Sequence, residues 1–177
     1  MAAKKKNLSA YDQSGMPPAV GLKIAIVVAD WNPEVTGALL EGALGSLEQH
    51  GLKRESVPVH RVPGSFELPA GAALAIRSSE LDSVICLGCV IQGETRHFEF
   101  IAQAVANGCT QLSINTGIPV IFGVLTTDTF DQAQARSGGK HGNKGDEAAI
   151  TAIKMATLKH QLPNTCRCLK YVDQKNS

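Results

Sequence analysis

The sequence has no excess of charge of either sign and no apolar segment long enough to cross a membrane. Its 177 residues carry 17 basic and 16 acidic side chains, so the formal net charge is only +1. A general binder of nucleic acid or of an anionic membrane surface would carry a clear basic excess. A membrane-spanning helix needs about 20 consecutive apolar residues, and no signal-peptide core is present either. We therefore expect a cytoplasmic protein that binds neither nucleic acid nor membrane.

Cysteine is also scarce, and the odd number of five fits a reducing compartment. Cys86 and Cys89 have the spacing of two zinc ligands, but they fall in an expected strand, where residues three apart point to opposite faces. Cys166 and Cys168 have no matching histidine cluster beside them. We therefore expect no metal site, and thiols that are buried or incidental.

The composition is ordinary for a globular protein, with 44% hydrophobic and 19% charged residues. A chain of this length favours one domain with a sizeable core. We expect that domain at residues 21–160, between a flexible amino-terminal arm at residues 1–20 and a carboxy-terminal tail at residues 161–177. Both ends are polar or irregular, so no secondary structure is predicted there.

Apolar segments alternate with helical patterns along the expected domain, which is typical of an α/β fold with a parallel sheet and crossover helices. Four strands are predicted, at residues 23–29, 56–62, 83–90 and 119–125. Helices are predicted from Pro33 to Gly51, from about 66 to 77, from about 96 to 109, briefly after residue 128, and up to about residue 160. Asn32 is expected to cap the first helix.

Each predicted strand ends in polar or turn residues, and in a parallel sheet these ends share one edge. Trp31, the only tryptophan, follows the first strand, where it could stack on a planar ligand or be a boundary residue of the core. Glu67 follows the second strand. It could accept hydrogen bonds from a polyol or simply favour the start of a helix.

The most informative run is VIQGETRHFEF at residues 90–100, between the third strand and its helix. A helix N-terminus offers free N–H groups to anions, and this one brings Gly93, Thr95, Arg96 and His97 together. His97 can exchange a proton near neutral pH, although a histidine in a first helical turn is often only exposed. The run predicts a phosphate seat beside a group for proton transfer.

A second glycine-rich run is RSGGKHGNKG at residues 136–145. It has the glycines and cations of a phosphate cradle, but Lys144 is followed by glycine instead of serine or threonine, so it does not match a nucleotide P-loop. The alternative is a flexible, solvated connection. The spacing alone does not choose between the two.

Taken together, these segments resemble the lumazine synthase family of riboflavin biosynthesis. The matching pieces are Trp31-Asn32 and residues 63–67, 88–100, 117–127 and 136–145, in the order and spacing of the family. The resemblance implies a three-layer, flavodoxin-like sandwich with a four-stranded parallel sheet flanked by helices. It also implies the penultimate step of the pathway, with no metal or cofactor. In that step, 5-amino-6-(D-ribitylamino)uracil condenses with 3,4-dihydroxy-2-butanone 4-phosphate to give 6,7-dimethyl-8-ribityllumazine, phosphate and water.

The resemblance also implies roles for individual residues. His97 is the candidate for proton transfer, and the phosphate would be received by Glu94, Thr95 and Arg136. The pyrimidine and its ribityl chain would be bound by Trp31, Asn32, Ser65, Phe66, Glu67, Val90, Ile91, Gln92, Phe122 and Lys144. Phe122, Arg136 and Lys144 would come from the neighbouring subunit, so each active site would lie at a subunit interface.

The family forms homopentamers, some of which assemble further into icosahedral shells. The run at residues 137–145 has no insertion relative to shell-forming members, whereas Trp31 is familiar from members that stop at the pentamer, so the assembly stays open. An association with riboflavin synthase also stays open.

Two residues depart from the family pattern. Gln92 stands where many members have a basic residue, so phosphate binding would rest more heavily on Arg136. His141 stands where a small residue is common, and it either adds a cation beside the phosphate or faces solvent.

Two other functions fit the same fold. One is the archaeal-type riboflavin synthase, which dismutates two lumazines; the motifs at residues 64–67 and 136–145 fit lumazine synthase better. The other is a non-catalytic flavin or lumazine carrier or shell protein. The presence of His97, Arg136 and Lys144 argues against such a carrier.

Overall fold

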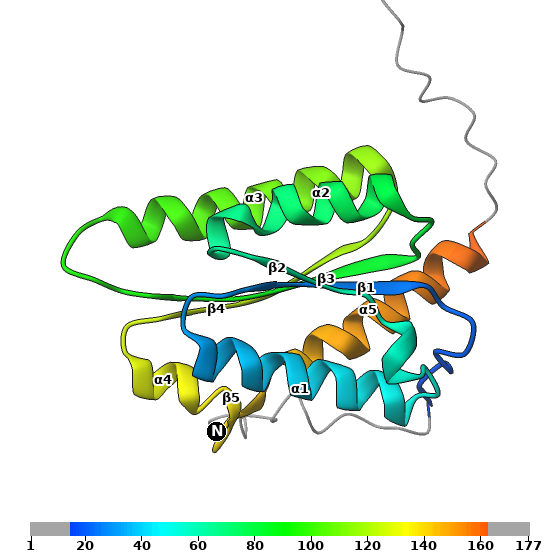
Figure 1. Cartoon of the computed structure of the whole chain (residues 1–177), viewed down its shortest axis with the longest axis horizontal. Coiled ribbons are helices and arrows are strands. Elements are labelled where there is room, and N and C mark those ends of the chain that lie inside the picture. The colour runs from blue at the N-terminus through cyan, green and yellow to red at the C-terminus, as the bar shows by residue number, and fades with distance from the viewer. Residues whose placement is uncertain (1–14, 163–177) are drawn as a thin grey trace, which may run out of the picture.

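Four parallel strands form the central sheet of the computed structural model, in the order β2-β1-β3-β4 (Figure 1). Their bounds are Ile24–Ala29 for β1, Val59–Val62 for β2, Ser83–Ile91 for β3 and Val120–Thr127 for β4. The structure describes residues 15–162, so most of the expected arm and tail, with Cys166 and Cys168, lies outside it. The predicted four-stranded parallel sheet is confirmed.

Helices cover both faces of this sheet and make three layers (Figure 1). On one face lie α2 (Leu68–Ser78) and α3 (His97–Thr116); on the other lie α1 (Pro33–Gln49), α4 (Phe130–Gln134) and α5 (Lys144–Gln161). Within the described residues, no helix is long and apolar enough to cross a membrane. The predicted three-layer, flavodoxin-like architecture is confirmed.

All six residues of β1 are buried because both of its faces are covered. Ile26 and Val28 pack in the core with α1 and α5, whereas Val27 and Ala29 pack with α2 and α3. This alternation explains why the strand is an unbroken apolar run in the sequence.

The same alternation puts Cys86 and Cys89 on opposite faces of β3, as predicted. Burial raises the pKa of the Cys89 thiol to about 11. A hydrogen bond with Cys109, together with burial, raises the pKa of Cys86. These three cysteines are free, and no group of three or more His, Cys, Asp or Glu side chains within residues 15–162 could hold a metal ion.

Two predicted boundaries, the start of the second strand and the end of the third helix, differ from the structure by more than two residues. The second strand begins at Val59, because residues 54–56 form a 3-10 turn in which the Ser56 hydroxyl donates to the carbonyl of Lys53. The helix α3 continues beyond Gly108, which lies against α2: an added Cβ would come within 2.8 Å of the Pro69 ring. Gly117, with a φ of 68°, ends the helix instead.

The glycine-rich run at residues 136–145 is a short hairpin, with strands β5 (Ser137–Gly139) and β6 (Gly142–Asn143). Gly138 and Gly142 have φ values of 114° and 84°, which favour glycine. At Gly145 a Cβ would overlap the carbonyl oxygen of Leu39 in α1. Backbone conformation and close contact thus account for three of its glycines.

Asn143, at the end of this hairpin, forms hydrogen bonds with both α1 and α5. Its Oδ1 accepts a hydrogen bond from the N–H of Gly145 at 2.8 Å, and its Nδ2 donates to the carbonyl of Ala38 at 2.9 Å. The start of α5 is therefore fixed against α1 by the hydrogen bonds of the Asn143 side chain and by the close approach that Gly145 permits.

We predict that Gly145→Ala lowers the free energy of unfolding by about 1–3 kcal/mol, because α5 must move away from α1 to admit the methyl group. Gly45→Ala is the matched control: Gly45 lies in α1, and a Cβ there meets nothing within 4 Å. The control should be neutral or stabilising by up to about 1 kcal/mol. Urea unfolding at one protein concentration measures both, and equal losses would contradict the prediction.

Candidate active site

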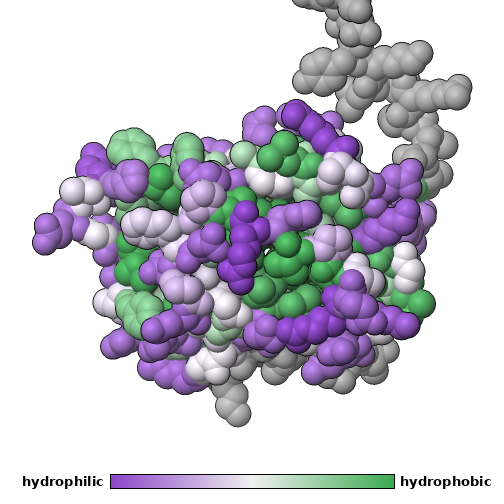
Figure 2. Space-filling model, in the orientation of Figure 1, coloured by the Kyte–Doolittle hydropathy of each residue, from purple (hydrophilic) through white to green (hydrophobic). Residues whose placement is uncertain are grey.

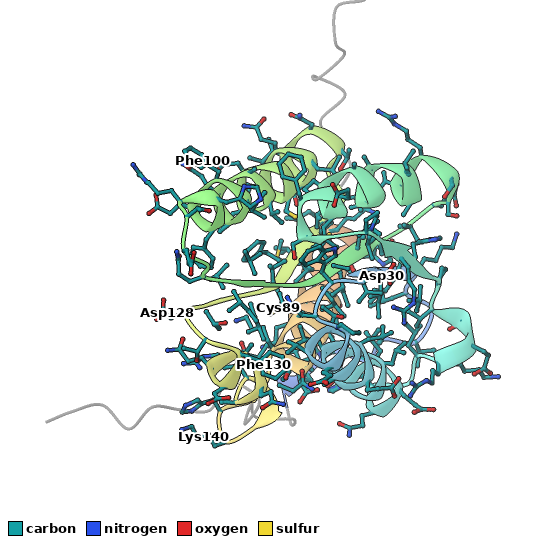
Figure 3. All side chains as sticks on the ribbon, turned by 60° about the vertical axis from the view of Figure 1, so that its left-hand side comes forward. Asp30, Cys89, Phe100, Asp128, Phe130 and Lys140 are labelled. Carbon is teal, nitrogen blue, oxygen red and sulfur yellow. The ribbon has the colours of Figure 1, made fainter. Side chains whose placement is uncertain are left out.

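The carboxyl ends of the strands meet at one edge of the sheet, as parallel pairing requires. The N–H of Asp30 donates to the carbonyl of Val62, and that of Gln92 donates to the carbonyl of Thr127, at 2.9 and 2.8 Å. In the view that brings this edge forward, Cys89 lies between Asp30 and Asp128 (Figure 3). The polar residues that follow the strands are thus gathered in one region.

The backbone carbonyl of Cys89, near the end of β3, joins two of these connections. It accepts hydrogen bonds from the Nδ2 of Asn32 at 3.2 Å and from the hydroxyl of Ser65 at 3.4 Å. Gly88 makes room for this arrangement, because a Cβ there would lie 2.6 Å from the Ser65 oxygen. The loops after β1 and β2 are therefore held to the end of β3.

Asn32 occupies the N-cap position of α1, as predicted, but its side chain does not form the expected capping hydrogen bond. Asn32 has φ and ψ of 59° and 56°, the only positive φ of a non-glycine residue among the described ones, and its side chain makes no capping bond. The amide is used on Cys89 instead, and the carbonyl of Asn32 accepts the first helical hydrogen bonds, from the N–H groups of Val35 and Thr36. Asparagine tolerates this left-handed conformation better than most residues do.

Two aromatic side chains stand out from this framework. Trp31 is 72% exposed and Phe66 is 55% exposed. The alternative that Trp31 is a boundary residue of the core is therefore wrong for the single chain. Exposed rings beside hydrogen-bonding groups suit a planar, polar ligand.

Glu67 accepts a hydrogen bond through only one of its two carboxylate oxygens within the described part of the chain. Its Oε2 accepts a hydrogen bond from the N–H of Gly64 at 3.1 Å, which fixes the turn that leads into α2. No described residue donates to its Oε1. The interpretation that Glu67 favours the start of the helix is therefore confirmed, and its second oxygen has no donor among the described residues.

Every residue of the turn between β3 and α3, from Gln92 to His97, is exposed. The N–H of His97, the first residue of α3, donates to the hydroxyl of Thr95 at 3.4 Å. None of the described residues makes a hydrogen bond with the His97 ring. The imidazole can therefore meet a ligand through either nitrogen.

A second group of predicted site residues lies along β4, α4 and α5. The Nη1 of Arg136 donates to the carbonyl of Gln132 at 2.9 Å, and Arg136 lines a cavity of about 420 Å³ that also includes His141. Lys144 pairs with Glu147 at 2.8 Å and shares a cavity of about 240 Å³ with Phe122. Neither cavity is lined by any residue of the first group.

The predicted site residues therefore form two groups in one chain. The first, at the end of β3 and on the connections after β1, β2 and β3, comprises Trp31, Asn32, Ser65, Phe66, Glu67, Val90, Ile91, Gln92, Glu94, Thr95 and His97; the second comprises Phe122, Arg136 and Lys144. The sequence analysis missed Gly88 and the carbonyl of Cys89. A glycine inside a buried strand is a signal of close backbone approach that could have found them.

Comparison with known proteins identifies the family. The family model described as 6,7-dimethyl-8-ribityllumazine synthase matches residues 21–160. The chain belongs to the 6,7-dimethyl-8-ribityllumazine synthase family.

Individual relatives agree with this assignment. A protein of that name from Parabacteroides distasonis is 54% identical over 158 residues, which cover 89% of this chain and 99% of the relative. One from Cytophaga hutchinsonii is 54% identical over 156 residues, covering 88% and 97%, and one from Phocaeicola vulgatus is 48% identical over 165 residues, covering 93% and 98%. The predicted family is confirmed, and the lumazine synthase assignment prevails over the archaeal-type riboflavin synthase and the carrier.

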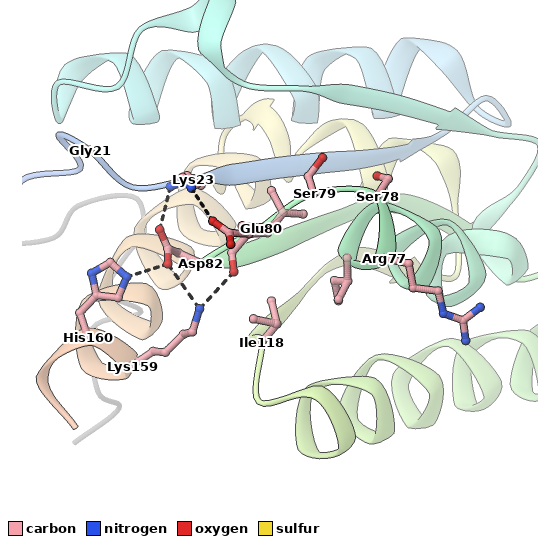
Figure 4. Close-up of a pocket in the computed structure, with 12 residues that line it drawn as sticks. Gly21, Lys23, Arg77, Ser78, Ser79, Glu80, Asp82, Ile118, Lys159 and His160 are labelled. Carbon is pink, nitrogen blue, oxygen red and sulfur yellow. Dashed lines mark hydrogen bonds and ion pairs between the residues drawn. The ribbon is translucent and has the colours of Figure 1, made fainter. Parts of the chain in front are cut away.

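A larger cavity, of about 740 Å³, lies at the opposite edge of the sheet (Figure 4). Its centre is Asp82, which accepts hydrogen bonds from the N–H of Lys23 at 2.9 Å and from the Nζ of Lys159 at 3.3 Å. The Nε2 of His160 lies 2.6 Å from the same carboxylate. Asp82 thus joins the starts of β1 and β3 to the end of α5.

This cavity is not the candidate lumazine synthase site. None of the predicted site residues lines it, and the helices α2 and α5 end there, so they present their carbonyl ends, which disfavour an anion such as phosphate. Lys23 and Lys159 are already paired, with Glu80 and Asp82. The cluster around Asp82 is a structural contact that fixes the last turn of α5.

We predict that Asp82→Asn lowers the free energy of unfolding at pH 7 by about 1–3 kcal/mol. Burial acts to raise the pKa of Asp82, but the hydrogen bonds from Lys23 and His160 outweigh it and hold the pKa below its ordinary value. The carboxylate therefore stabilises the fold above that ordinary value, and the contribution is lost as the pH falls through the lowered pKa. The difference between wild type and variant should accordingly shrink in acid.

Glu80→Gln is the matched control, since its carboxylate is 92% exposed in the ion pair with Lys23. It should change the stability by less than about 0.5 kcal/mol. Urea unfolding at pH 7 and across the acid range compares the two variants. An Asp82→Asn effect that stayed constant as the pH fell would refute the electrostatic explanation.

Proposed function

We propose that this enzyme condenses 5-amino-6-(D-ribitylamino)uracil with 3,4-dihydroxy-2-butanone 4-phosphate at active sites that are shared between neighbouring chains. The observation that carries the proposal is that the cavities lined by the second group of site residues contain no residue of the first group. The first group follows β1, β2 and β3, whereas the second lies along β4 and the helices beside it. A neighbouring chain that brought its second group to the first would complete the site.

Such a contact joins two different surfaces and is therefore heterologous, so it closes into a ring when the rotation allows. The resemblance to the family implies five members, and we propose a homopentamer. Apolar groups interrupt the polar surface of the chain (Figure 2), and large exposed residues of α2 and α3, Leu74, Phe100 and Ile114, are 65%, 65% and 71% exposed. A ring would cover such residues.

For the pyrimidine substrate, we propose stacking on Trp31 and Phe66. The free Oε1 of Glu67 would accept hydrogen bonds from the ribityl hydroxyls. Asn32 and Ser65 give a hydrogen bond each to Cys89, so they would meet the ligand through their remaining groups. The backbone of Val90 and Ile91, with Phe122 and Lys144 of the neighbour, would complete this half of the site.

For the phosphate, we propose the N–H groups of the turn after β3, including that of Glu94, together with the Thr95 hydroxyl and Arg136 of the neighbour. One of the five N–H donors of Arg136 binds the carbonyl of Gln132, which orients the guanidinium, and no other described residue accepts a hydrogen bond from it. A guanidinium can then meet two phosphate oxygens at once, which a lysine does not reproduce.

The chemistry needs proton transfers at several steps. The 5-amino group adds to the ketone carbonyl and water leaves, phosphate is eliminated, the enol becomes a ketone, and ring closure with loss of water gives the lumazine. Holding both reactants together supplies much of the acceleration. His97, at the start of α3, would transfer these protons. We also propose that residues 21–160 form the catalytic domain and that the enzyme is cytoplasmic.

We predict that His97→Ala lowers kcat by about 100-fold without abolishing the reaction, because general acid–base catalysis assists a condensation that proximity already favours. His60→Ala serves as a control, since His60 is exposed on β2 and belongs to neither group. Phosphate release and lumazine absorbance with both substrates saturating give kcat. Wild-type turnover in His97→Ala would remove the histidine from the mechanism, and a wild-type rate no faster than the spontaneous condensation would remove the enzyme function.

We predict that Arg136→Ala raises KM for the phosphorylated ketone by about 10–100-fold, since a hydrogen bond to a charged group contributes about 1.5–3 kcal/mol. Binding of an unreactive pyrimidine analogue should change by less than about twofold. Equal losses for the two ligands would count against the phosphate role.

Mixing tests whether the site is shared. Arg136→Ala and His97→Ala chains, unfolded together and reassembled, should turn over faster than either variant alone when the ketone is kept well below its KM for Arg136→Ala, because about one interface in four would combine two intact halves. If every site lay within one chain, the mixture would give only the average of the two variants.

A further inference from the structure

We infer that Gln92 is a positioning residue: its side-chain amide holds the phosphate-binding turn in shape and does not itself touch a substrate. The inference rests on the proposed function, in which the turn after Gln92 receives the phosphate. Its basis is the contact made by the Gln92 side chain, which the sequence analysis placed among the groups that bind the pyrimidine.

Gln92 forms hydrogen bonds through both its backbone N–H and its side-chain amide. It directly follows β3, and its N–H donates to the carbonyl of Thr127 in β4 at 2.8 Å. Its side-chain Nε2 turns back onto the next residues and donates to the carbonyls of Gly93 at 2.8 Å and Thr95 at 3.4 Å. One amide group has two N–H donors, so both of its protons are used.

These two contacts set the direction of the neighbouring N–H groups. In a planar trans peptide, the carbonyl of one residue and the N–H of the next point in opposite directions. The carbonyls of Gly93 and Thr95 face the Gln92 amide, so the N–H groups of Glu94 and Arg96 point away from it. No described residue accepts a hydrogen bond from either N–H. Outward N–H groups at the start of a helix attract an anion, so these two can contribute to a phosphate seat.

The side chains of the turn contribute no net positive charge. Gln92 is neutral and Glu94 is acidic, and Arg96 is paired with Glu99 at 2.9 Å. The turn on this chain therefore supplies N–H donors without a net positive charge, and the charge that binds phosphate would come from Arg136 of the neighbour. A basic residue at position 92 would supply N–H donors and a positive charge. Gln92 supplies the donors without the charge.

The test uses Gln92→Met, which keeps the length of the side chain, stays neutral and removes the donors. Gln92→Lys restores a donor and adds a charge. Gln49→Met makes the same exchange at an exposed position near the end of α1. Each variant is assayed for KM of both substrates and for kcat, and its Kd for inorganic phosphate is measured by titration. Thermal melting verifies folding, with Gln92→Ala as the replacement if Gln92→Met fails to fold.

The expected result is a selective change. Gln92→Met should raise KM for the phosphorylated ketone and Kd for phosphate by about tenfold, since two hydrogen bonds that orient the seat are lost. KM for the pyrimidine and kcat should change by less than about twofold, and Gln49→Met should match wild type. Gln92→Lys should bind phosphate at least as tightly as wild type does.

Two outcomes would overturn the inference. Wild-type phosphate binding in Gln92→Met would show that the amide does not shape the seat. An equal loss in Gln92→Met and Gln92→Lys, or a loss of pyrimidine binding in both, would show that Gln92 touches a substrate directly. A wild-type protein that released no phosphate would refute the proposed function instead, and its Kd for inorganic phosphate would still decide the role of Gln92.

Discussion

The parallel pairing of four strands is the constraint on which the other features depend. Because all strands run one way, their carboxyl ends and the helix starts that follow them share one edge, and the helix ends share the other. The first edge has outward N–H groups and the candidate site. At the second edge, where helices end, Lys159 donates to the carbonyl of Leu81 and to the carboxylate of Asp82. One topological choice thus separates the edge that can bind an anion from the edge that holds the last helix.

The strand and helix order could be predicted from the sequence, because burial on both faces leaves a strong pattern. The run at residues 24–29 is apolar throughout, and α1 repeats its buried residues at helical spacing. By contrast, the fate of Asn32 depends on Cys89, 57 residues away. A local pattern states that asparagine suits a helix start, but it does not state which distant carbonyl its amide will meet.

The candidate site shows the same limit. Residue types with chemical potential, such as His97 and Arg136, could be recognised from the motifs and the family resemblance. Their separation within one chain could not be derived from spacing, since it depends on where β4 and α4 lie relative to β3. The glycines of residues 136–145 are a further example. A positive φ and a close approach to Leu39 require glycine there, and in the sequence these glycines cannot be told from those of a phosphate-binding loop. The Asp82 cluster gave no signal, since its partners are 59 to 78 residues apart in the sequence.

The Cys89 carbonyl has a consequence for how the sequence can vary. The acceptor that holds Asn32 and Ser65 is a main-chain atom, so a substitution of the Cys89 side chain leaves it in place. Natural variation at position 89 is thereby limited by packing against α1 and α5 and not by the geometry of the site. At position 88, in contrast, any side chain would displace the Ser65 hydroxyl. Two adjacent residues of one strand are thus expected to evolve under quite different restrictions.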